Sequence, residues 1–125
     1  MFVADTHALV WYILRKAPLK VRNIFKDAEN NNEVIYIPTI ALAEMFHAII
    51  KERIQLDYEE ALSIIQQNPN YKIIGFDYSI LKEFVKIKGF DLHDNIIVAT
   101  AKFLDATLIT KDEDIIKSKI VKTIW

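Results

Sequence analysis

The chain has 125 residues, of which 52% are hydrophobic and 26% are charged, as in a soluble globular protein of one domain covering 1–125. A net charge of −1, with only 3 Arg among 16 basic residues, excludes a general polyanion binder, and the absence of cysteine excludes disulfides and thiolate sites. No basic leader or apolar run of ~20 residues is present, so we expect a cytoplasmic protein without a membrane span.

The first half of the chain alternates between short apolar segments and longer segments with helical periodicity. In chain order we predict a strand over 2–5, a helix over 7–14, a helix over 18–29, a strand over 34–37 and a helix over 39–53. Either Asp5 or Thr6 can cap the first helix, and Pro18 suits the first turn of the second. Thr39 is expected to cap the third.

The second half continues the alternation. In chain order we predict a helix over 58–67, a strand over 71–76, a helix over 78–88, a helix over 92–104, a strand over 107–110, a helical turn over 114–117 and a strand over 121–124. Asp57 and Glu60 form a capping-box pattern, Asp77 can cap the next helix, and Gly89 stands where a glycine would end that helix.

Strands that are short and apolar throughout, each separated by a helix, indicate a largely parallel sheet covered on both faces. The predicted fold class is therefore α/β, with three layers and a sheet of four to five strands. In such sheets, ligands bind beyond the carboxyl ends of the strands. Asp5 and Asp112 both fall at that edge.

Four acidic residues carry most of the functional information: Asp5, Glu44, Asp94 and Asp112. An ionised carboxylate in apolar surroundings is costly unless it is paired or coordinates a metal. Each has a structural explanation as well. Asp5 could be a helix cap, Asp94 lies in a first helical turn where the helix dipole favours an anion, and Asp112 could be an ordinary loop residue. Together the four suggest a hard-cation site for phosphodiester chemistry.

Glu44 is the least easily explained of the four, because it lies mid-helix between Ala, Leu, Met and Phe residues. The alternative is a polar helical stripe through Glu44, His47 and Lys51, at spacings of three and seven residues. That stripe is narrow, so the sequence favours a functional role for Glu44.

Other chemical signals are weaker. His7, His47 and His93 lack the spacing of a zinc site, and the single Glu44-x-x-His47 is half of a di-iron motif. With two glycines in the chain, a phosphate-binding P-loop is excluded. A phosphotransferase that uses Asp5 as a nucleophile would need Asp-x-Asp after the first strand, whereas the chain has Asp5-Thr6-His7.

Four segments resemble the PIN-domain ribonucleases, and most of all the VapC toxins of prokaryotic toxin–antitoxin systems. They are DTHALVW at 5–11, IALAE at 40–44, LHDNIIVATA at 92–101 and LITKD at 108–112. The resemblance spans nearly the whole chain in order, and the first and third segments are the specific ones. One departure is Asn95, which stands where many relatives carry Arg.

The resemblance implies a PIN-like α/β/α sandwich and a Mg²⁺- or Mn²⁺-dependent endoribonuclease that cuts RNA by attack of a metal-activated water. By motif position the catalytic and metal-binding residues would be Asp5, Glu44, Asp94 and Asp112. Supporting positions would be Thr6, Thr110 and Asp114. A small antitoxin protein and a homodimer are the implied partners. The alternative is a PIN-like domain that has lost catalysis and serves as a protein- or RNA-binding module.

A chain with nearly no net charge needs local positive potential to admit RNA to an acidic centre. We expect the RNA-guiding side chains among seven basic residues: Arg15, Lys16, Lys20, Lys51, Arg53, Lys86 and Lys88.

Overall fold

The computed structural model describes residues 1–125 and contains one five-stranded sheet in which every neighbouring pair of strands is parallel. Its strands are β1 (Phe2–Ala4), β2 (Ile35–Pro38), β3 (Tyr71–Ile74), β4 (Thr107–Ile109) and β5 (Thr123–Ile124). The order across the sheet is β3-β2-β1-β4-β5. The chain therefore builds one half of the sheet outward from β1 and then returns to build the other. The carboxyl ends of β1 and β4 flank the point of reversal, where open α/β sheets bind ligands.

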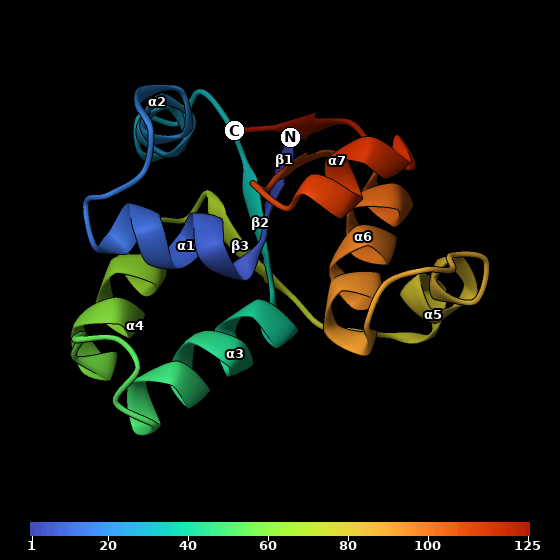
Figure 1. Cartoon of the computed structure of the whole chain (residues 1–125). Coiled ribbons are helices and arrows are strands. Elements are labelled where there is room, and N and C mark those ends of the chain that lie inside the picture. Colours follow the sequence, from blue (N-terminus) through green and yellow to red (C-terminus); the bar gives the residue numbers. More distant parts are fainter.

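Seven helices cover the two faces of the sheet. They are α1 (Thr6–Ile13), α2 (Leu19–Glu29), α3 (Thr39–Ile50), α4 (Tyr58–Gln67), α5 (Tyr78–Phe84), α6 (Leu92–Leu104) and α7 (Glu113–Ser118). α1 to α4 lie on one side of the sheet and α5 to α7 on the other (Figure 1). This arrangement confirms the predicted three-layer α/β fold. None of the helices has both the length and the apolar character that a bilayer crossing needs.

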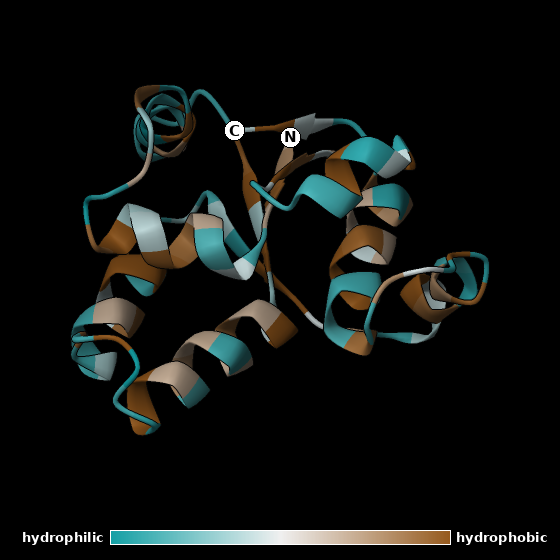
Figure 2. Cartoon of the chain, viewed as in Figure 1, coloured by the Kyte–Doolittle hydropathy of each residue, from teal (hydrophilic) through white to brown (hydrophobic).

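Two apolar cores, one on each face, fix the sheet between its helices. Ala4 and Ile109 belong to the core beneath α1, α2 and α4, whereas Val3 and Leu108 belong to the core beneath α6. All four are fully buried. Neighbouring residues in a strand point to opposite faces, so a strand buried on both sides must be apolar at every position. Figure 2 shows the strands as mostly hydrophobic segments between helices with mixed surfaces.

Helix α1, which carries Asp5 at its start, is held to its neighbours by an aromatic and acidic network. The rings of Tyr12 and Phe25 stack with centroids 4.1 Å apart. The hydroxyls of Tyr12 and Tyr71 both donate to the Glu29 carboxylate, the latter at 2.6 Å. Burial and this carboxylate raise the pKa of Tyr12 to about 12, so the hydroxyl stays protonated and able to donate. Because α1 is joined in this way to α2 and β3, Asp5 has a fixed position.

Several predicted boundaries were wrong. β3 ends at Ile74 rather than at residue 76, β5 begins at Thr123 rather than at residue 121, and Pro18 is the cap before α2 rather than part of its first turn. Thr39 is the first residue of α3 rather than its cap, and that helix ends at Ile50 instead of continuing to Arg53. Helix α5 ends at Phe84, well before Gly89. The reason is tertiary: the Asn95 amide of α6 donates to the carbonyls of Phe84, at 3.4 Å, and Ile87, at 3.2 Å, and so caps the end of α5. Gly89 lies beyond, with φ at 101°.

Helix ends in this chain rarely use glycine. Five non-glycine residues adopt the left-handed conformation, with φ between 50° and 63°: Arg15, Asn31, Glu52, Asp105 and Lys119. Such a conformation costs an L-residue about 1–2 kcal/mol, which glycine would avoid. The chain therefore accepts local strain wherever these helices turn back.

Candidate functional site

Two carboxylates are placed by the strands that flank the reversal point. Asp5 follows β1 and caps α1 by accepting a hydrogen bond from the Ala8 amide at 2.7 Å. Asp112 follows β4 and caps α7 by accepting from the Ile115 amide at 2.9 Å. The capping explanation offered for Asp5 is therefore correct, and Asp112, for which the alternative was an ordinary loop position, is a helix cap as well. A cap occupies one carboxylate oxygen, so it leaves a second role possible.

Glu44 reaches the same edge from the middle of α3. Its Oε1 accepts a hydrogen bond from the Thr6 hydroxyl at 2.8 Å. Its Oε2 lies 3.4 Å from Nδ1 of His93, in the first turn of α6. Glu44 thus joins three helices, and the predicted supporting residue Thr6 is the one that orients it.

Asp94 shows most directly that the four predicted carboxylates share one site. Its pKa is raised to about 6, first by partial burial and then by the negative charge of its neighbours. Those neighbours are Asp91, Asp112, Glu44 and Asp5. The structure therefore brings Asp5, Glu44, Asp94 and Asp112 together as what we call the acidic cluster. Their roles in catalysis stay a prediction.

The acidic cluster has no Lys or Arg partner, and the basic side chains next to it are those of His7 and His93. Asp5 is only 6% exposed, and burial is the main reason that its pKa is raised. Hydrogen bonds from the Thr110 hydroxyl and the Ala8 amide, and the proximity of His7, act in the opposite direction. No Lys or Arg lies within ion-pair distance of any cluster member. Crowded carboxylates without a counter-charge are stable only if protons or a bound cation neutralise them.

The donor chemistry of the cluster fits a hard divalent cation, because it consists only of oxygens. The geometry is open: no three His, Asp or Glu side chains lie close enough together to hold one ion. A cation here would have to draw the carboxylates inward. Asp5, whose amide donates to the Ile109 carbonyl of β4 at 3.2 Å, and Asp112, at the start of α7, could do so by rotation of their side chains.

The loop that carries Asp112 is fixed to α1 by a cation–π contact. The Lys111 ammonium lies 3.7 Å from the ring centroid of Trp11. The Trp11 ring also meets Trp125 edge-on, with centroids 5.6 Å apart. Within the same loop, the Asp112 amide donates to the Thr110 hydroxyl at 3.1 Å. Thr110, a predicted supporting residue, thus contacts Asp112 and stabilises the charge of Asp5.

The structure adds two residues that the sequence interpretation missed. Asp91 caps α6 by accepting a hydrogen bond from the Asp94 amide at 2.9 Å, and it is the largest of the charge effects that raise the pKa of Asp94. His93 contacts Glu44. The signal for Asp91 was available, since an acidic residue three positions before Asp94 is a capping pattern. Nothing in the sequence linked His93 to Glu44, which is 49 positions earlier.

Two other predicted positions lie away from the cluster. Asp114 is exposed in the first turn of α7 and is not among the charges that act on Asp94. Asn95 is 7% exposed and faces the end of α5, with its Oδ1 buried and without a hydrogen-bond partner. An arginine at this position would meet the α5 packing rather than the acidic cluster.

The seven predicted RNA-guiding residues are exposed but dispersed. Arg15, Lys16 and Lys20 follow the far end of α1, about 15 Å from Asp5 at 1.5 Å per helical residue. Lys86, which pairs with Glu83, and Lys88 lie in the segment between α5 and α6. Lys51 and Arg53 follow α3, and Arg53 shares a hollow with Glu44.

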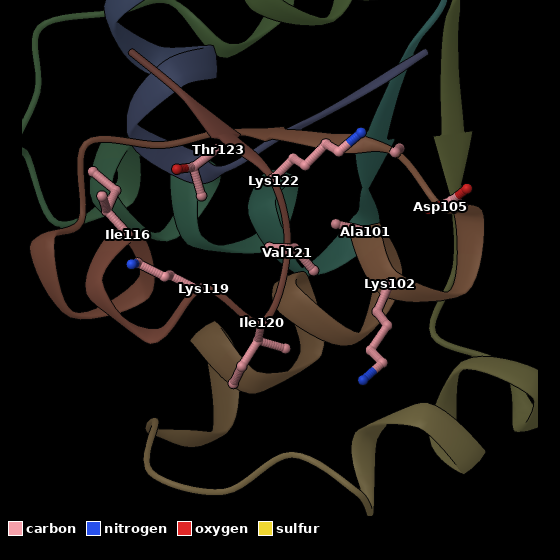
Figure 3. A pocket seen from close by; sticks show the side chains of 10 residues that line it. Ala101, Lys102, Asp105, Ile116, Lys119, Ile120, Val121, Lys122 and Thr123 are labelled. Atoms are coloured by element: carbon pink, nitrogen blue, oxygen red, sulfur yellow. The ribbon is translucent and has the colours of Figure 1, made fainter.

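The largest hollow of the molecule is elsewhere and contains no predicted catalytic residue. Its volume is about 690 Å³, and it lies among the end of α6, α7 and the start of β5 (Figure 3). That is the amino edge of the sheet, opposite the cluster. Figure 3 shows the ammonium groups of Lys102, Lys119 and Lys122 pointing away from one another, so they do not form one anion site.

Comparison with known proteins shows the family of this chain. The family model described as the PIN domain matches residues 2–120. No curated protein matches in sequence.

Several solved structures share the fold at low sequence identity. VapBC2 from Rickettsia felis, bound to a promoter DNA fragment, has a TM-score of 0.75 at 17% identity, covering 98% of this chain and 96% of that chain. FitAcB from Neisseria gonorrhoeae has a TM-score of 0.71 at 20% identity, covering 100% of this chain and 97% of that chain. DNA-bound VapBC from Salmonella typhimurium has a TM-score of 0.72 at 16% identity, covering 98% of this chain and 96% of that chain.

Proposed function

The chain belongs to the PIN domain family, a family of nucleases, and from that premise we propose that it is a Mg²⁺- or Mn²⁺-dependent endoribonuclease. We further infer that it is a cytoplasmic toxin of a type II toxin–antitoxin pair. The observation that carries the proposal is the acidic cluster, in which carboxylates from four separate elements gather at the reversal point of the sheet without a Lys or Arg partner. A structural need for four such charges at one point is hard to find, because each raises the cost of the others.

The carboxylates of the cluster would bind the cation and so position it next to the scissile phosphate. When bound, Mg²⁺ or Mn²⁺ would supply an activated water and neutralise charge on the phosphate. Asp5 and Asp112 are pre-oriented by their caps, and Glu44 by Thr6. Cleavage by water would leave a 5′-phosphate and a 3′-hydroxyl, whereas attack by the RNA 2′-hydroxyl would leave a cyclic phosphate.

The proposed partners are an antitoxin and a second copy of the chain. The neighbours in structure include toxin–antitoxin complexes, such as the one from Klebsiella pneumoniae. On this chain an apolar hollow formed by Phe46, Ile49, Ile50 and Tyr58 adjoins the second half of α3. An inhibitor could place an apolar helix there and direct a basic side chain to the carboxylates. For the dimer we favour the exposed apolar side of α5.

The decisive experiment is RNA cleavage by the full chain with Mg²⁺, with Mn²⁺ and with excess EDTA, followed by analysis of the product ends. We expect cleavage only with a divalent cation and products that a 5′-phosphate-dependent exonuclease degrades. Asp94→Asn should abolish cleavage, and Asp105→Asn, the same change at an exposed position outside the cluster, should not. Cyclic phosphate ends, undiminished cleavage in EDTA or full activity of Asp94→Asn would contradict the proposal.

The alternative function is a PIN-like binding module without catalysis. The observation in its favour is that no three cluster side chains lie at coordinating distance. It predicts RNA or protein binding without cleavage under any metal condition, so the same experiment separates the two functions.

A further inference from the structure

Another hollow, lined by apolar residues and four charged or histidine side chains, opens beside the acidic cluster along α3. Its volume is about 560 Å³, and its lining includes Glu44, His47, Arg53 and His93. Glu44 is also a member of the cluster, so the hollow and the cluster share a wall. A polymer whose scissile bond lies at the carboxylates would therefore have a neighbouring unit at this hollow.

The backbone after α3 turns Arg53 back toward the hollow. Glu52 adopts φ 56°, the Glu52 amide donates to the Ile49 carbonyl at 3.0 Å, and the Arg53 amide donates to the Ala48 carbonyl at 2.9 Å. This pair of hydrogen bonds is the Schellman motif, which reverses the chain at a helix end. Arg53 is six residues beyond His47 in sequence but lines the same hollow because of this reversal.

The hollow has more hydrogen-bond donors than acceptors. No carboxylate lies within ion-pair distance of Arg53, although Glu44 lines the same hollow. The Glu44 carboxylate is already engaged by Thr6 and His93. The Arg53 guanidinium has five N–H donors in a planar fork and the imidazole of His47 adds at least one, whereas Nδ1 of His93 faces Glu44. A ligand that fits this lining should be an acceptor with several oxygens and a negative charge.

We propose that this hollow binds the backbone phosphate of the RNA substrate that is next to the scissile phosphate, with Arg53 as its principal donor. The inference rests on the proposed ribonuclease function. Arg53 is a binding residue here, and its contact with one particular phosphate would fix which linkage of the RNA reaches the carboxylates. Of the seven basic residues predicted to guide RNA, Arg53 is thereby assigned to one particular phosphate of the substrate.

The test is a double-mutant cycle of RNA-binding affinities, in which one change is the replacement of Arg53 and the other is the modification of a single RNA linkage. The probes are fluorescently labelled single-stranded RNAs, each with one phosphate replaced by a neutral methylphosphonate, at every linkage in turn. Binding is measured by anisotropy over a range of KCl concentrations with Mg²⁺ present. The protein is the full chain carrying Asp94→Asn to prevent cleavage, with and without Arg53→Ala. Lys102→Ala removes the same charge at the opposite edge of the sheet and is the matched control.

We expect Arg53→Ala to weaken binding of unmodified RNA roughly tenfold or more, as for loss of a charge-assisted pair. The salt dependence of log Kd should fall by about 0.7, the value for one contact to a single strand. One methylphosphonate should weaken binding to Arg53-containing protein and have no effect after Arg53→Ala. Lys102→Ala should leave the effect of every linkage unchanged. If every methylphosphonate acts equally with and without Arg53, the hollow is not a phosphate site.

The failure of this inference is distinguishable from the failure of the proposed function. RNA cleavage by the wild-type chain without coupling between Arg53 and any linkage would overturn the phosphate site alone. Coupling to one linkage without cleavage under any metal condition would support the phosphate site and overturn the ribonuclease. Thermal unfolding of Arg53→Ala is the control for folding. The variant should unfold like the wild type, because the Arg53 side chain is exposed. Arg53→Lys should restore charge but only part of the affinity, because lysine lacks the fork.

Discussion

The crowding of carboxylates predicts that Asp94→Asn stabilises the metal-free protein. Asp94 has a pKa of about 6 in the folded chain against an ordinary 3.8. A group with a raised folded-state pKa is stabilising when protonated, below its unfolded pKa, and that contribution is lost as the pH rises through the folded pKa. Above about pH 6 the wild type therefore holds an unfavourable charge that Asn would remove.

The magnitude follows from the size of the shift. About two pKa units correspond to a ceiling of roughly 3 kcal/mol at neutral pH. Asp94 is partly exposed, so solvent screening reduces this to about 1–2 kcal/mol. The variant also loses the favourable interaction of an anion with the first turn of α6, which lowers the gain by about 0.3–1 kcal/mol. We expect a net gain of about 1 kcal/mol, or about 4 °C in Tm for 125 residues.

The assay is thermal unfolding in EDTA, from acid to one pH unit above the folded pKa. The advantage of Asp94→Asn should be full at the upper end and disappear below about pH 4, where the wild-type carboxyl is protonated in both states. Asp105→Asn is the control, because Asp105 is exposed and lies in the left-handed conformation that Asn tolerates. With Mg²⁺ at ~100 times its Kd the wild type should gain about 2.7 kcal/mol and the variant less. A variant that is less stable than the wild type in EDTA at neutral pH would refute the reasoning.

Three further predictions concern the rest of the molecule. Lys119→Gly should raise the free energy of unfolding by about 0.5–1 kcal/mol, since glycine removes the cost of φ 56°; a denaturant titration showing no gain would mean that the helix end is unstrained. Asn95→Ala should cost about 1–3 kcal/mol and speed hydrogen exchange in α5, because the Phe84 and Ile87 carbonyls lose their donor; unchanged exchange would count against this cap. The wild type should be a dimer by light scattering and Val85→Lys, at a residue that is 65% exposed directly after α5, should be monomeric; a dimeric variant would place the interface elsewhere.

The sequence predicted well what local rules determine. Asp57 and Asp77 each cap the helix that they were expected to cap. Asp5, one of the two residues expected to cap α1, is its cap. Apolar strands between amphipathic helices were enough for the α/β class. Non-local contacts were beyond these rules. The end of α5 depends on Asn95, from another helix, and no pattern within α5 itself contains that information.

The candidate site divides in the same way. Carboxylates at strand ends could be found because the edge of a parallel sheet is implied by the alternation itself. Glu44 was found as an exception, a charge inside an apolar helical run. His93 could not be found, because its meaning depends on the approach of α6 to α3. Arg53 was one basic residue among seven until the helix end placed it beside Glu44.

The position of β1 at the centre of the sheet has a consequence for the newly made chain. β1 is synthesised first, yet one of its two neighbours is β4, which begins more than a hundred residues later. The acidic cluster takes its members from position 5 to position 112, so it cannot assemble until this entire stretch has left the ribosome. A nascent nuclease of this topology would be harmless to the messenger and ribosome that are making it.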